Sequence, residues 1–239
     1  MRRALVTGGT TGIGAAICAA LHAAGIRVAA TYSGNEARGA AFSDRTGIPV
    51  FRWDVSDHAA CAVGAAEVEA AIGPIDILVN NAGITRDASL LKMSEEAWKR
   101  VLAVDLDSCF NMAQAVVGGM KVRRWGRIVN IASINGQTGQ FGQTNYAAAK
   151  AGMLGFTKAL ALEVARDGVT VNAVAPGYTD TDMVAAVSPE IIKTIIARIP
   201  VGRLAQPEEI ARCVVFLVAE EAGFITGSTL SVNGGQAMI

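Results

Sequence analysis

Histidine and paired cysteine are scarce in this chain of 239 residues. The two histidines are His22 and His58, and the four cysteines are widely scattered with no CxxC pair. Zinc sites and disulfide frameworks are built from clusters of such residues. We therefore expect no metal site and buried free thiols, and histidine is a poor candidate for acid–base catalysis here.

Excess charge and long apolar runs are missing as well. The 21 Lys and Arg balance the 21 Asp and Glu, so there is no overall basic field for nucleic acid or an anionic membrane. No run approaches the ~20 apolar residues that a membrane span needs. The apolar run in MRRALVTGG is too short for a signal peptide. We expect no nucleic-acid or membrane partner and a cytoplasmic location.

Short apolar runs alternate with longer alanine-rich stretches along the whole chain. The apolar runs predict strands at 4–7, 28–32, 50–53, 77–80, 128–132, 170–174 and 229–232. The stretches between them predict helices near 13–24, 35–45, 57–71, 94–120, 145–166 and 207–219. This alternation is typical of a parallel sheet covered by helices on both faces. The predicted fold class is α/β, a single domain (1–239) with a doubly wound, parallel seven-stranded sheet of the Rossmann type.

The first predicted strand runs directly into the glycine-rich stretch TGGTTGIG (7–14). Glycine permits a tight turn and lets the backbone approach a pyrophosphate at the positive N-terminus of the next helix. Gly8, Gly12 and Gly14 lie in the first strand-to-helix turn, which is the context that a dinucleotide-binding motif requires. A structural turn without a ligand is the alternative.

The end of the second predicted strand distinguishes between cofactors. An acidic residue there would bind the ribose 2′-hydroxyl of NAD, but the chain has Tyr32 and Ser33, with Arg38 a little further on. A site without the acid and with a nearby arginine tolerates a 2′-phosphate, so we predict NADPH as the cofactor. Arg38 could also be an ordinary solvated helix residue.

Two further motifs follow the third and fourth predicted strands. Asp54-Val55 follows the third strand, and NNAG (80–83) the fourth. Ligands of open α/β sheets bind at these carboxyl ends. Asn80 and Asn81 could be plain turn residues, or could line, with Ala82 and Gly83, a groove for the cofactor.

Tyr146 and Lys150 are four residues apart at a predicted helix start, which places them on one face of the helix. Alone they indicate a half-buried aromatic beside a solvated lysine. Ser133 ends the preceding strand, so all three can face one crevice. A lysine ammonium favours the phenolate form of a neighbouring tyrosine. Tyr146 could then exchange a proton with a carbonyl oxygen to which Ser133 hydrogen-bonds.

These motifs together resemble the short-chain dehydrogenase/reductase family. The matching segments are TGGTTGIG, Asp54, NNAG, Ser133, Tyr146-xxx-Lys150 and PGYTDT (176–181), in family order. The resemblance implies hydride transfer with a nicotinamide cofactor and catalysis by Ser133, Tyr146 and Lys150. One departure is Asp105, where family members usually carry an Asn that anchors a water in the proton relay. Asp105 could keep that relay with a changed pH dependence, or be structural.

Within the family, the segments ITRDASL (84–90), NGQTGQFGQTNY (135–146) and NGGQAM (233–238) resemble NADPH-dependent reductases of acetoacetyl-CoA. The product implied by this resemblance is (R)-3-hydroxybutyryl-CoA, for polyhydroxybutyrate synthesis. The resemblance also implies a homotetramer, and residues 176–206 would form a lid over the thioester. The implied substrate-binding residues are Asp87, Gln140, Phe141, Gly142, Gln143, Gly177 and Tyr178. The implied cofactor-binding residues are Gly8, Thr10, Thr11, Gly12, Ile13, Gly14, Arg38, Asp54, Val55, Asn81, Ala82, Gly83, Ile84, Thr85, Tyr146, Lys150, Pro176, Gly177, Tyr178 and Thr179.

Three other functions stay open at this point, and one of them is a dehydrogenase of another small hydroxy compound. A 3-oxoacyl-[acyl-carrier-protein] reductase would use the same chemistry, and Arg123, Arg124 and Arg127 could dock its acidic carrier or be solvated helix-end charges. A non-catalytic dinucleotide sensor would share the fold, but it has no need of Ser133, Tyr146 and Lys150 together.

Overall fold

The computed structural model describes residues 1–181 and 188–238. In this part of the chain the strands pair in parallel, in the order β3-β2-β1-β4-β5-β6-β7. They are β1 (Arg3–Val6), β2 (Arg27–Tyr32), β3 (Val50–Arg52), β4 (Ile77–Asn80), β5 (Gly126–Ile131), β6 (Val169–Pro176) and β7 (Thr229–Val232). The predicted α/β fold class with a seven-stranded, doubly wound parallel sheet is confirmed.

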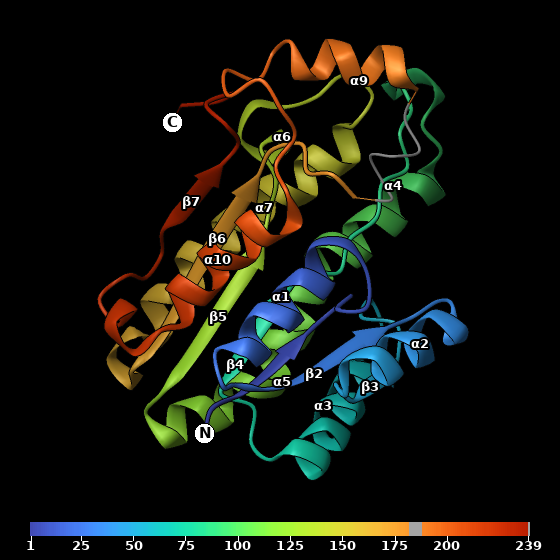
Figure 1. Cartoon of the computed structure of the whole chain (residues 1–239). Helices are drawn as coiled ribbons and strands as arrows, with labels where there is room; N and C mark the ends of the chain where they lie inside the picture. The colour runs from blue at the N-terminus through green and yellow to red at the C-terminus, as the bar shows by residue number, and fades with distance from the viewer. Residues whose placement is uncertain (182–187, 239) are drawn as a thin grey trace.

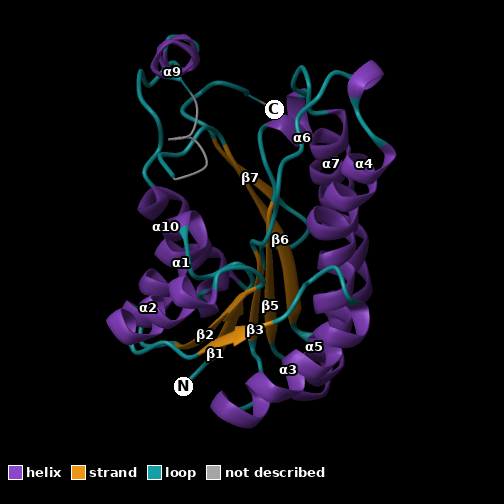
Figure 2. Ribbon diagram, turned by 90° about the vertical axis from the view of Figure 1, so that its right-hand side faces the viewer, coloured by secondary structure: helices purple, strands orange, loops and turns teal. Residues whose placement is uncertain are grey.

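Helices cover both faces of the sheet (Figure 2). On one side lie α1 (Gly12–Ala23), α2 (Glu36–Thr46) and α10 (Pro207–Val218). On the other lie α3 (His58–Ile72), α4 (Glu95–Leu102), α5 (Ser108–Arg123) and α7 (Thr144–Val164). Two helices that the sequence did not predict, α6 (Asn135–Thr138) and α9 (Pro189–Ile196), lie at the carboxyl end of the sheet (Figure 1).

The strands form near-continuous apolar runs because both of their faces are buried. In β1, Leu5 packs into the core beneath α3 and α5, whereas Ala4 and Val6 pack into the core beneath α1 and α10. Every residue of β5 and β6 is buried. A strand buried on both faces does not alternate apolar and polar residues as a half-exposed strand does. The strands were therefore predicted from the short apolar runs between helical stretches.

The helix starts follow ordinary capping chemistry. Asn35, Asp57 and Ser94 each precede a helix, and their side-chain oxygens accept hydrogen bonds from backbone N–H groups of the first turn. Such caps satisfy donors that have no partner within the helix. The helix predicted over 94–120 is present as a continuous helical stretch, in which a π-helical turn (Ala103–Asp107) joins α4 to α5.

That continuous helical stretch, Glu95–Arg123, is long and apolar enough by composition to cross a membrane. This differs from the expectation that no run of the sequence approaches such a length. Half of its most apolar part is buried inside the protein. Met112, Val116 and Met120 of α5 belong to the core beneath the sheet. The stretch is therefore a core helix, and its apolar composition follows from that packing.

The segment predicted as a lid, 176–206, is tied together at its two ends. Thr179 forms a parallel bridge with Ala205. The backbone N–H of Asp180 donates to Ala205 O at 2.8 Å, and Ala205 N–H donates to Tyr178 O at 3.0 Å. Between these ends lies α9, while 182–187 fall outside the described residues. Its service as a lid stays a prediction.

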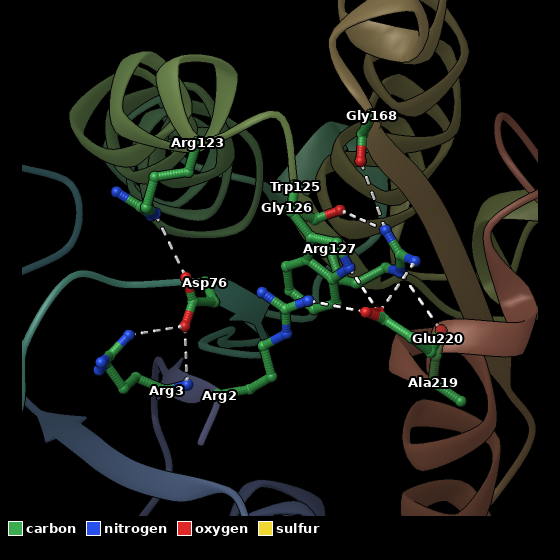
Figure 3. Close-up of polar contacts among 10 residues, drawn as sticks. All are labelled: Arg2, Arg3, Asp76, Arg123, Trp125, Gly126, Arg127, Gly168, Ala219 and Glu220. Atoms are coloured by element: carbon green, nitrogen blue, oxygen red, sulfur yellow. Dashed lines mark hydrogen bonds and ion pairs between the residues drawn. The ribbon is translucent and has the colours of Figure 1, made fainter.

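At the amino ends of the strands, a polar cluster joins distant parts of the chain (Figure 3). The Trp125 ring lies between the guanidinium groups of Arg2 and Arg127, 3.5 and 4.4 Å from its centroid. Glu220 accepts hydrogen bonds from Arg2 and from Trp125 Nε1. The buried carboxylate of Asp76 accepts from Arg3 N and Nη1, both at 3.2 Å, and lies 3.3 Å from Arg123 Nε.

We expect Asp76→Ala to lower the free energy of unfolding by about 2 kcal/mol, because three donors lose a buried acceptor. The loss stays below that of a fully buried pair since Arg3 and Arg123 are about one-third exposed and can be hydrated. Chemical denaturation measures the change. The control is Glu36→Ala, which removes an exposed ion pair with Arg52 and should cost less than about 0.5 kcal/mol. Equal losses in both variants would contradict the structural role of Asp76.

Candidate active site

The candidate site lies at the carboxyl ends of the strands, where the strand order reverses. From β1 the chain builds outward to β2 and β3, and then returns to add β4 on the other side of β1. The connections that leave β1 and β4 therefore diverge and open a crevice between them. A cleft of about 510 Å³ lies there, lined from the glycine-rich turn at one end to Tyr178 at the other.

Asn81 fastens the glycine-rich turn to the end of β4. Its Nδ2 donates to Thr7 O at 2.9 Å and to Gly8 O at 3.1 Å. Its backbone N–H and that of Ala82 donate to Thr7 Oγ1 at 3.0 and 3.1 Å. The NNAG motif thus holds the turn in shape, besides lining the cleft. Asn80 is buried and donates instead to Asn130 of β5.

The glycine-rich turn has the shape of a pyrophosphate cradle. Gly12 has a φ of 50°, a left-handed conformation that suits glycine. At Gly14 a Cβ would lie 2.2 Å from Gly8 O, so no side chain fits there. The bare backbone leads directly into the N-terminus of α1, whose free N–H groups favour an anion. These features fit the pyrophosphate of a dinucleotide cofactor.

Asp54, just beyond β3, is held by two neighbours. Its Oδ1 accepts from Ser56 N and Oγ, at 3.0 and 2.7 Å, and Arg100 Nη2 of α4 donates to its Oδ2 at 2.9 Å. Burial raises the pKa of Asp54, but the hydrogen bonds from Ser56 and Arg100 outweigh it and lower the pKa overall. Asp54 is therefore an ionised, fixed acceptor at one end of the cleft.

The three predicted catalytic residues all line this cleft. Ser133 follows β5, while Tyr146 and Lys150 lie one turn apart in the first half of α7. The Lys150 ammonium lies 5.5 Å from the centroid of the Tyr146 ring. Ser133 is 8% exposed, and its Oγ accepts from Asn135 N at 3.1 Å, which leaves its own hydroxyl proton available to a ligand.

Lys150 is almost completely buried and is held from two sides. Its Nζ donates to Ile131 O of β5 at 3.0 Å and lies 3.4 Å from Oδ2 of the buried Asp105. Burial alone would lower the pKa of Lys150, but the negative charge of Asp105, with contributions from Tyr146 and Cys109, raises it overall. Burial raises the pKa of Asp105, and Lys150 and the Ile84 N–H offset only part of that rise.

At the other end of the cleft three polar residues form a chain of hydrogen bonds. Asn135 Nδ2 donates to Gln143 Oε1 and Gln143 Nε2 donates to Asp87 Oδ2, both at 2.8 Å. Burial, followed by the charge of Asp87, raises the pKa of Tyr178, so its hydroxyl stays protonated. This wall presents amide and hydroxyl groups to a ligand beside Tyr146.

The structure brings most of the predicted site residues to this one cleft. Those that line it are Gly8, Thr11, Gly12, Ile13, Gly14, Asp54, Val55, Asn81, Ala82, Gly83, Ile84, Thr85, Asp87, Ser133, Gln143, Tyr146, Lys150, Pro176, Gly177, Tyr178 and Thr179. Five others lie outside its lining: Thr10, Arg38, Gln140, Gly142 and Phe141, whose side chain is exposed. The individual roles of all these residues stay predictions.

Several lining residues were missed by the sequence analysis. Arg100 belongs to a helix with no recognisable motif, and nothing local indicates its approach to Asp54. Trp53 could have been found, because it directly precedes Asp54 at the end of a strand. In the described residues, no group of three or more His, Cys, Asp or Glu is arranged to hold a metal ion.

A parallel sheet with a dinucleotide cradle at its switch point, and a buried lysine beside a tyrosine, defines a nicotinamide-dependent oxidoreductase. The chain belongs to the short-chain dehydrogenase/reductase family. A family model described as enoyl-(acyl carrier protein) reductase matches residues 8–237.

Curated relatives match over nearly their full lengths. The chain is 61% identical to an acetoacetyl-CoA reductase of Rhizobium meliloti (strain 1021), covering 98% of each protein. It is 59% identical to an acetoacetyl-CoA reductase of Shinella zoogloeoides, covering 100% of this chain and 99% of the relative. It is also 46% identical to a 3-oxoacyl-[acyl-carrier-protein] reductase of Escherichia coli (strain K12), covering 99% and 97%.

Proposed function

We propose that this protein reduces acetoacetyl-CoA to (R)-3-hydroxybutyryl-CoA with NADPH, a reaction that supplies polyhydroxybutyrate synthesis. The observation that carries the proposal is the identity of about 60%, over almost the entire chain, to relatives named acetoacetyl-CoA reductase. A half-buried tyrosine beside a buried lysine, in the same cleft as the dinucleotide cradle, supports the same chemistry. The product's configuration and its use follow from the resemblance alone.

The chain's own residues would divide the work as follows. Tyr146 donates its hydroxyl proton to the ketone oxygen, and the Ser133 hydroxyl donates a hydrogen bond to the same oxygen as charge develops on it. Lys150, held by Ile131 O, keeps a positive charge beside Tyr146 and would also hold the nicotinamide ribose. Asp87 and Gln143, which are hydrogen-bonded to each other, would orient the thioester arm. The bound nicotinamide supplies the hydride.

NADPH rather than NADH is proposed as the cofactor. The end of β2 carries Tyr32 and Ser33, which line the cleft and bring no carboxylate against a 2′-phosphate. Arg38 is in the first turn of α2, where Asn35 caps its backbone N–H. Gly12, Gly14 and Asp54 would hold the pyrophosphate and the adenosine.

Acyl-carrier-protein thioesters are the second candidate substrate, favoured by the relative from Escherichia coli. The arginines considered for carrier docking do not support it. Arg123 pairs with Asp76, Arg124 donates to Arg166 O, and Arg127 is buried, which contradicts a solvated role for Arg127. All three lie where β5 begins, whereas the cleft is lined by residues at the carboxyl ends of the strands. Figure 3 shows Arg123 and Arg127 at this amino end.

A substrate panel with both cofactors tests the proposal. We expect kcat/KM to be at least about tenfold higher for acetoacetyl-CoA than for acetoacetyl-carrier-protein, since roughly 1.4 kcal/mol of differential binding suffices. At equal concentration NADPH should support faster reduction than NADH. A preference for the carrier-protein thioester would make that thioester the substrate in place of acetoacetyl-CoA. A preference for NADH would refute the cofactor assignment.

A dinucleotide sensor without catalysis is disfavoured by the buried Lys150 beside Tyr146, because burying a charge is costly and binding alone does not need it.

The homotetramer and the cytoplasmic location are part of the proposal. Apolar side chains exposed on α5 and α7, among them Phe110, Val122 and Leu162, are compatible with contacts between copies of the chain.

A further inference from the structure

We propose that Asp105 is a positioning residue that balances the charge of Lys150 and so keeps Tyr146 protonated, which sets the site for proton donation and thus for reduction. The inference rests on the proposed function only in taking Tyr146 as the proton donor. It concerns a residue that does not line the cleft and would not touch the substrate.

The geometry of Asp105 is that of a counter-ion. It is fully buried in the π-helical turn between α4 and α5. Its Oδ1 accepts from Ile84 N at 2.8 Å. Its Oδ2 receives no hydrogen bond from any residue that the structure describes, yet lies 3.4 Å from Lys150 Nζ. A buried carboxylate in this position needs a cation to offset its desolvation, and Lys150 is that cation.

Among the described residues, no other anion near Lys150 can balance the charge of its ammonium group. The groups that act on its ammonium are Asp105 from the π-helical turn, Tyr146 from α7 and Cys109 from α5. Burial raises the pKa of Cys109 to about 12, so the thiol is neutral. Asp107 is exposed, and the carboxylate of Asp87 is on the substrate side with Gln143.

The consequence for Tyr146 follows from electrostatics. A lone buried ammonium strongly favours a phenolate, because the phenolate is then its nearest anion. When a carboxylate already neutralises the ammonium, that attraction is weakened and the phenol keeps its proton to higher pH. A reductase needs the protonated phenol, whereas the reverse oxidation needs the phenolate. Asp105 therefore favours the form required for reduction.

The test is a spectroscopic titration of tyrosinate absorbance without any acyl-CoA. The sequence holds three tyrosines, so subtracting the matching Tyr146→Phe protein isolates Tyr146. In Asp105→Asn we expect the titration midpoint of Tyr146 to fall by about one to two pH units, because a negative charge that disfavours the nearby phenolate is removed. The alkaline decline of the reduction rate should move in the same direction.

The matched control is Asp107→Asn, the same change on the exposed side of the same turn. Its midpoint should shift by less than about 0.3 pH unit, because solvent screens that charge. If Asp105→Asn does not fold, as judged by circular dichroism and NADPH binding, Asp105→Ala is titrated instead and should shift downward too. An unchanged or raised midpoint in a folded variant overturns the inference. A downward shift in a protein inactive on acetoacetyl-CoA upholds it and refutes only the proposed substrate.

Discussion

We expect Tyr146→Phe to lose at least about a hundredfold in kcat/KM for acetoacetyl-CoA while it still binds NADPH. The substitution removes one hydroxyl and leaves the ring, so the ketone oxygen has no proton donor; general acid catalysis is typically worth 10²–10⁴-fold. The Lys150–Asp105 ion pair and the bond from Lys150 to Ile131 O do not depend on that hydroxyl. Steady-state kinetics and a fluorescence titration with NADPH measure the two effects separately.

Tyr178→Phe is the matched comparison, since it removes a hydroxyl from another tyrosine that lines the same cleft. We expect it to lose less than about tenfold, because that hydroxyl contributes one hydrogen bond and no proton. If Tyr146→Phe kept more than a tenth of the activity, the acid would have to be another group, and the sensor interpretation would regain support.

The second large effect is expected for Gly14→Ala, in the cradle rather than at the reacting atoms. The new Cβ would lie 2.2 Å from Gly8 O and 2.5 Å from Asn81 Nδ2, so the backbone or the Asn81 bonds must shift. Overpacking of this kind costs about 1–3 kcal/mol. We expect NADPH to bind at least about tenfold more weakly, since 1.4 kcal/mol corresponds to a factor of ten. Fluorescence titration gives the affinity, and thermal denaturation gives the stability.

Gly118→Ala is the control for this substitution. Gly118 is exposed in α5, and a Cβ there would meet nothing within 4 Å. Alanine in a helix interior should stabilise the protein by about 0.5–1 kcal/mol relative to glycine, with NADPH affinity unchanged. Normal NADPH affinity in Gly14→Ala would mean that the turn is not the pyrophosphate site.

Much of the fold could be predicted from local patterns. All seven predicted strands exist, and their ends match the prediction or differ from it by at most two residues. Apolar runs between longer helical stretches were sufficient, because each run is buried on both faces of the sheet. The four-residue helix α6 was not predictable, since so short an element has no periodicity to detect.

The π-helical turn within the helix predicted over 94–120 was equally hidden. Residues 95–123 are continuously helical, and only the π-helical turn at Ala103–Asp107 interrupts the regular winding. No breaker residue marks that turn in the sequence. In the folded protein the turn carries Asp105, which contacts Ile84 N and Lys150 Nζ.

The strand–helix alternation, the glycine turn and the one-turn spacing of Tyr146 and Lys150 follow from local sequence. Each is set by residue type and by distance along the chain. Folding in three dimensions was needed to bring Arg100 to Asp54, 46 residues away, and to bury Asp105 against Lys150. Such contacts depend on how helices pack against the sheet, and a charge's environment is set by that packing rather than by its neighbours in sequence.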